Sequence, residues 1–124
     1  MGKELHFGKD ILTLKVTGLT SFFAFKRKIL IPYKMIEEVF VGSFQAPQWM
    51  IRAPGTSFAP LNIYEGSFKY RDEWYFLSYA RTDSLLKIEL NGHEKYNYII
   101  IQIDNPTEIA ASIRRHIHLN QEYV

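Results

Sequence analysis

Residues 85–117 read LLKIELNGHEKYNYIIIQIDNPTEIAASIRRHI, and this stretch indicates the class of fold. Its first part alternates apolar and charged residues, the period of a strand that buries one face: Leu86, Lys87, Ile88, Glu89 and Leu90. The dipeptide Asn91-Gly92 predicts a turn, because both residues tolerate positive φ. Isoleucine then recurs at every second position, which predicts a second strand over residues 96–103.

The rest of the stretch changes to the period of a helix, which we expect from about Pro106 to His118. Asn105 can cap the first turn with its side-chain oxygen, and Glu108 completes a capping-box-like pair. One side of the helix carries an apolar stripe formed by Ile109, Ala110, Ile113 and Ile117. A helix with one apolar side must lie on another element, and the preceding sheet is the obvious partner.

Length and composition limit the possible classes of protein. A chain of 124 residues predicts a single domain, 1–124, with a core over about 11–117. It contains no cysteine, which excludes disulfides and thiolate sites and fits a reducing compartment. The net charge of +2 is too small to indicate a nucleic-acid partner. We find neither a signal-peptide core nor a membrane span, so we expect a cytoplasmic protein, with peripheral membrane attachment as the alternative.

The chain before this stretch is rich in strand patterns. Including the two strands described above, alternation predicts seven, over residues 12–17, 23–31, 35–41, 61–70, 74–79, 85–90 and 96–103. Residues 1–10 are expected to be a loosely held lead-in. Residues 43–60 carry three of the five prolines and predict a long loop. Arg27 falls on the apolar face of its strand, which predicts a bulge or the mouth of a barrel there.

Several short strings resemble those of uncharacterised bacterial pleckstrin-homology-like (PH-like) proteins. They are Ile31-Pro32-Tyr33 with Ile36 and Val39, Arg52-Ala53-Pro54-Gly55-Thr56, Gly66-Ser67-Phe68 with Phe76, and Asp104-Asn105-Pro106. The resemblance covers about residues 11–117. It implies a mainly β fold in which two near-orthogonal sheets form a seven-stranded antiparallel open barrel capped by one C-terminal helix. A fold of this kind does not by itself imply an activity.

A basic run, Lys26-Arg27-Lys28, is the first candidate site. Eukaryotic PH relatives bind phosphoinositides through basic residues on the first two strands, a pattern that Lys15, Lys26 and Lys28 loosely follow. Lys28 stands where those relatives have an arginine, so the bidentate grip on phosphate is lost. The resemblance therefore implies weak contact with anionic lipid. The alternative is that these lysines are solvated charges that protect a strand edge from aggregation.

The loop over residues 43–60 is the second candidate site, because aromatic and arginine side chains often anchor protein interfaces. Trp49, Met50 and Arg52 form either a partner-binding lid or a plug over one end of the barrel. The four histidines are too dispersed to suggest a metal site: His6, His93, His116 and His118. No acidic pair has a partner that would complete a catalytic site. We expect no cofactor.

The sequence therefore predicts a non-enzymatic PH-like binding or scaffolding module that acts through protein–protein contact or self-association. An open barrel leaves strand edges unpaired, and edge pairing is a common route to both. The alternative function is a peripheral membrane module that binds anionic lipid headgroups weakly.

Overall fold

The computed structural model describes residues 2–20, 23–46, 51–58 and 63–122. Its elements are β1 (Gly2–Phe7), β2 (Ile11–Thr20), β3 (Phe23–Pro32), a 3-10 turn (Tyr33–Met35), β4 (Ile36–Gly42), β5 (Ile51–Phe58), β6 (Ile63–Tyr70), β7 (Glu73–Tyr79), β8 (Leu85–Leu90), β9 (Tyr98–Ile101) and α1 (Pro106–Glu122). The predicted mainly β fold with two sheets and one C-terminal helix is confirmed.

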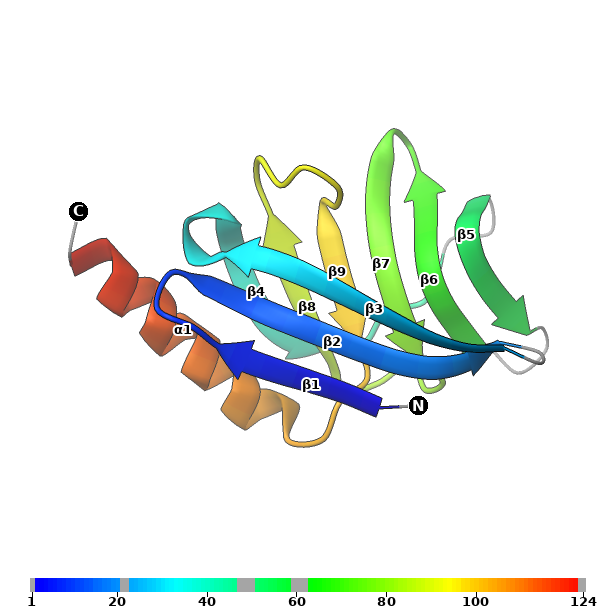
Figure 1. Ribbon diagram of the computed structural model, residues 1–124, viewed down its shortest axis with the longest axis horizontal. Coiled ribbons are helices and arrows are strands. Elements are labelled where there is room, and N and C mark those ends of the chain that lie inside the picture. Colours follow the sequence, from blue (N-terminus) through cyan, green and yellow to red (C-terminus); the bar gives the residue numbers. More distant parts are fainter. Residues whose placement is uncertain (1, 21–22, 47–50, 59–62, 123–124) are drawn as a thin grey trace.

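The strands form a three-stranded sheet, β1-β2-β3, and a six-stranded sheet, β4-β8-β9-β7-β6-β5. In Figure 1 the small sheet crosses in front of the large one at a steep angle, with β1 as its lower edge. The helix α1 closes the end where β1 and β2 approach β4, and packs mainly on β4 and the 3-10 turn.

Two details of the predicted barrel are wrong. The described residues contain nine strands rather than seven, and β7 pairs with β9 in parallel. The parallel pairing involves β9, where Ile99, Ile100 and Ile101 are all buried, so both faces of this strand are covered. Such a continuous apolar run is typical of a strand in the interior of a sheet, and β9 lies between β8 and β7.

The N-terminal residues are not a loosely held lead-in. Strand β1 pairs antiparallel with β2 from Gly2 opposite Thr17 to Phe7 opposite Leu12. The missed signal is alternation within a short, polar strand, in which the side chains of Lys3, Leu5 and Phe7 are half-buried and those between them are exposed.

The predicted long loop over residues 43–60 is also wrong in part, because β5 lies within it. Pro54 is compatible with this strand for two reasons. The pairing of β5 with β6 shifts register between Arg52 and Gly55, and β5 is at the edge of the sheet.

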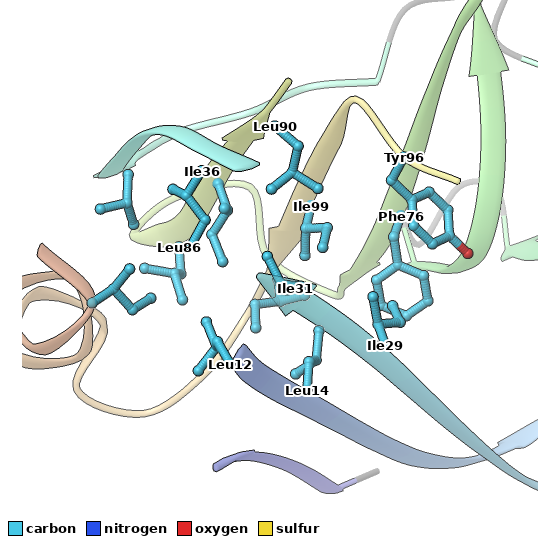
Figure 2. Close-up of a cluster of buried hydrophobic side chains, with 14 of the residues drawn as sticks. Leu12, Leu14, Ile29, Ile31, Ile36, Phe76, Leu86, Leu90, Tyr96 and Ile99 are labelled. Atoms are coloured by element: carbon cyan, nitrogen blue, oxygen red, sulfur yellow. The ribbon is translucent and has the colours of Figure 1, made fainter. Parts of the chain in front are cut away.

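The hydrophobic core lies between the two sheets and α1. Figure 2 shows Leu12 and Leu14 of β2 and Ile31 of β3 converging with Leu86 and Ile99 of the large sheet. The predicted apolar stripe of α1 is confirmed. Its central residues, Ala110 and Ile113, are buried, and Ile109 and Ile117 pack beside them.

The predicted side-chain cap of α1 is not formed. Asn105 has a φ of 56°, whereas a capping residue normally has extended backbone. Its carbonyl accepts a hydrogen bond from the Ile109 N–H at 3.0 Å, and its side chain makes no hydrogen bond to the described residues. Asparagine suits this position because it tolerates the left-handed region better than most residues.

Candidate functional site

Two basic residues of the first candidate site, Lys15 and Lys28, lie on the outer face of the small sheet. Lys15 of β2 is directly opposite Lys28 of β3, and both are exposed. The register places Lys26 opposite Thr17, and its side chain is outside the described residues. Neither Lys15 nor Lys28 forms an ion pair in the part of the chain that the structure describes. Like charges directly opposite each other on paired strands are unfavourable, so this pair does not stabilise the sheet.

The charge of this face is mixed. Glu4 of β1 is opposite Lys15 on the other side, and its carboxylate lies 3.1 Å from His6 Nε2. Glu4, Lys15, Arg27 and Lys28 line a depression of about 450 Å³. The Arg27 guanidinium is already hydrogen-bonded to Ser67 and Tyr96, so an anion bound here would meet mainly separate ammonium groups and a nearby carboxylate.

Two residues of the second candidate site, Trp49 and Met50, lie outside the described residues. Arg52 is in β5 opposite Phe68, and its side chain is also outside them. The segment just before, at Phe44 and Ala46, packs on the outer face of the large sheet.

Arg27 has a different environment from its neighbouring lysines. Of the two alternatives predicted at Arg27, a bulge or the mouth of a barrel, the bulge is wrong, because Arg27 pairs in regular register with Val16. Its guanidinium points between the sheets and donates to Ser67 Oγ at 3.0 Å and to Tyr96 Oη at 3.1 Å. It also lies 5.5 Å from the centre of the Phe76 ring. Ser67 and Tyr96 are hydrogen-bonded to each other at 2.6 Å, so Arg27 joins the two sheets through a closed polar cluster.

A second polar cluster lies near the first. Glu65 of β6 is only 4% exposed, and Ser78 Oγ lies 2.9 and 2.8 Å from its two carboxylate oxygens. Burial raises the pKa of Glu65, and the Ser78 hydrogen bond and the charges of Lys3 and Arg27 offset this effect in part. Burial also lowers the pKa of Lys3, against the attraction of Glu65 and Asp104. Lys3 therefore carries a charge that its surroundings only partly compensate.

Lys3 stands at a third site, a groove of about 600 Å³ that we call the β1 groove. One wall is formed by the inward side chains of β1, Lys3, Leu5 and Phe7. The opposite wall is formed by residues from the end of β7, the β9–α1 linker and α1: Tyr79, Ala80, Arg81, Gln102, Ile103, Asp104 and Ile109. Gln102 Oε1 stabilises this wall, because it accepts hydrogen bonds from the N–H groups of Ala80 and Arg81.

The backbone of β1 is unpaired along this groove. The Gly8 N–H donates to the Ile11 carbonyl, so Phe7 and Leu12 are a non-hydrogen-bonded pair. Hydrogen-bonded and non-hydrogen-bonded pairs alternate along an antiparallel ladder. The N–H and C=O groups of Lys3, Leu5 and Phe7 therefore point away from β2, toward the free edge. No other described residue hydrogen-bonds to them.

The other edge of the small sheet is partly blocked. His93, in the connection between β8 and β9, has its Nε2 2.9 Å from the Leu30 carbonyl on β3. Of the edges of the small sheet, β1 is thus the one that keeps a row of open backbone groups beside a groove.

The structure also bears on metal sites and membrane spans. Within the described ranges, no three His, Asp or Glu side chains come together as a metal site would require. His116 stacks on Phe7 and Tyr33, with ring centroids 4.7 and 5.5 Å apart. No helix among the described residues is both long enough and apolar enough to cross a membrane.

Comparisons of the chain with protein-family models, with curated proteins and with solved structures found no match. The resemblance to bacterial PH-like proteins therefore stays a prediction.

Sequence reasoning missed the β1 groove and the Arg27 cluster. The alternation of Lys3, Leu5 and Phe7 was available as a signal. The partners of Arg27, in contrast, are 40 and 69 residues away, and nothing local to Arg27 points to them.

Proposed function

We propose that this chain is a non-enzymatic binding module that contacts another polypeptide by strand addition to the free edge of β1. The observation that carries this proposal is the row of outward N–H and C=O groups at Lys3, Leu5 and Phe7 beside the β1 groove. Main-chain hydrogen bonds along such an edge supply affinity, and pockets for alternate side chains supply specificity.

A protective role for β1 is the competing explanation. Short edge strands with an inward-pointing charge, such as Lys3, discourage unwanted pairing. The groove argues for binding, because apolar side chains of Leu5, Phe7 and Ile103 line space that an added strand could fill. Self-association through the same edge is a form of this function in which the added strand comes from a second copy.

Leu5→Pro tests the proposal, because it removes one outward N–H and leaves the hydrogen bonds between β1 and β2 in place. Leu5→Val is the matched control, since it keeps the N–H and an apolar side chain. Peptides selected from a random display library on the wild-type chain should lose binding to Leu5→Pro and keep it on Leu5→Val. Circular dichroism and urea unfolding establish that both variants fold. Selected peptides that bind Leu5→Pro unchanged would contradict the proposal.

The basic face supports a second candidate function, weak attachment to anionic membrane. The observation in its favour is the pair Lys15 and Lys28, exposed, opposite each other and without an ion pair among the described residues. Each surface lysine contributes roughly 1 kcal/mol on anionic lipid, so attachment should be weak.

Liposome cosedimentation tests this second function. Binding should appear at low salt, disappear at 0.5 M salt through screening, and disappear in Lys26→Glu/Lys28→Glu. It should not distinguish phosphoinositide isomers. Tight binding at high salt would contradict the picture of separate, screened charges.

A further inference from the structure

The side chains that line the β1 groove fix the pattern of a segment added to β1. In a paired strand, residues directly opposite each other project to the same face. Lys3, Leu5 and Phe7 project into the groove, so the residues opposite them on an added strand project into it too. The side chains at three alternate positions of the added segment therefore lie in the groove, and those of the intervening residues point to the outside.

Two of the three positions require apolar side chains. The residues opposite Leu5 and Phe7 meet the half-buried side chains of these two residues and the nearby Ile103 and Ile109. A charged residue there would lose water against these apolar side chains.

The third position, opposite Lys3, requires a negative charge. Lys3 is half-buried, and its ammonium has no carboxylate within ion-pair distance among the described residues. Glu65, a buried carboxylate whose charge attracts Lys3, is already hydrogen-bonded to Ser78. The groove contains one further cation, Arg81, and a single acid, Asp104, so its lining carries a net positive charge.

We propose that the partner of this chain is an extended segment with the pattern apolar–x–apolar–x–acidic, added antiparallel to β1 with its acidic side chain on Lys3. This proposal rests on the function proposed above. An antiparallel segment passes Phe7 first and Lys3 last, which sets the order of the pattern. We expect the antiparallel direction because antiparallel pairing is slightly more stable per residue than parallel pairing.

Fluorescence anisotropy with two labelled nine-residue peptides tests the pattern. Both consist of threonine with valine at the first two groove positions, and the third position is Glu in one and Lys in the other. We expect the Glu peptide to bind wild type about tenfold more tightly than the Lys peptide, since like charges brought together at an interface are strongly unfavourable. Lys3→Glu should reverse this preference. Lys34→Glu changes an exposed lysine of the 3-10 turn, outside the groove, and should leave it unchanged.

The outcomes separate this inference from the proposed function. Equal affinities for the two peptides, both abolished by Leu5→Pro, would overturn the acidic position and keep strand addition to β1. A preference for the Glu peptide that persists in Lys3→Glu would also overturn the assignment to Lys3. Failure of both peptides, together with library peptides that are insensitive to Leu5→Pro, would overturn the proposed function itself.

Discussion

Replacing Arg27 with methionine should destabilise the fold, because Arg27 connects the two sheets. The substitution removes two hydrogen bonds from a charged donor, to Ser67 and Tyr96. Such bonds contribute about 1.5–3 kcal/mol each, and the contact with Phe76 adds about 0.5–1 kcal/mol. Against this, methionine avoids the cost of half-burying a guanidinium, which is several kcal/mol for a fully buried ion. Ser67 and Tyr96 keep their mutual hydrogen bond, so neither is left without a partner. The expected net loss is about 2 kcal/mol.

Urea unfolding at pH 7, followed by tryptophan fluorescence and circular dichroism, measures this loss. Arg27→Lys is the matched control, since it keeps the charge and loses the planar fork, and it should cost about half as much. An Arg27→Met variant at least as stable as wild type would refute the reasoning. It would show that the cluster is tolerated in the core and does not stabilise the contact between the sheets.

Three further changes test other parts of the structure. Ile113→Ala should lower the free energy of unfolding by roughly 2–4 kcal/mol in urea melts, because it leaves a cavity where α1 meets the sheets. Asn105→Ala should cost about 1 kcal/mol through its positive φ, and Asn105→Gly should cost nothing in the same melts; equal losses would restore the side-chain cap as the explanation. Glu65 has a raised pKa in the folded state, so its contribution to stability is present below the ordinary glutamate pKa of about 4.3 and is lost as pH rises through the folded pKa. Thermal melts of Glu65→Gln should therefore show a gain over wild type that is larger at pH 8 than at pH 4; a pH-independent difference would contradict the burial of a charged carboxylate.

Local patterns in the sequence predicted the elements whose periodicity is strong. The alternation at Leu86, Ile88 and Leu90 and the stripe around Ile113 each reflect one buried face, and a single buried face is visible in a local window. The turn at Gly92, which has a φ of 80°, could also be predicted from a local pattern, the dipeptide Asn91-Gly92. These patterns were enough for the class of fold.

Local patterns of this kind do not predict how the strands are arranged. The run Ile99–Ile101 shows that a strand is buried on both faces, but not which strands flank it. β5 was missed because Pro54 and Gly55 are turn residues by composition, and an edge strand with a register shift accommodates them. Of the candidate sites, the pairing of Lys15 with Lys28 follows from alternation and strand pairing. The β1 groove does not, because it forms between residues 72 to 106 positions apart in the chain, from Phe7 and Tyr79 to Lys3 and Ile109.

Amide hydrogen exchange along β1, followed by NMR, tests most directly whether this edge is the recognition surface. In the free protein, the N–H groups of Lys3, Leu5 and Phe7 should exchange fast, and those of Glu4 and His6, which face β2, should exchange slowly. Adding a peptide selected on the wild-type chain should slow the first three and leave the other two unchanged. Uniform protection along β1 before the peptide is added, or fast exchange at Leu5 after it binds, would contradict strand addition at β1.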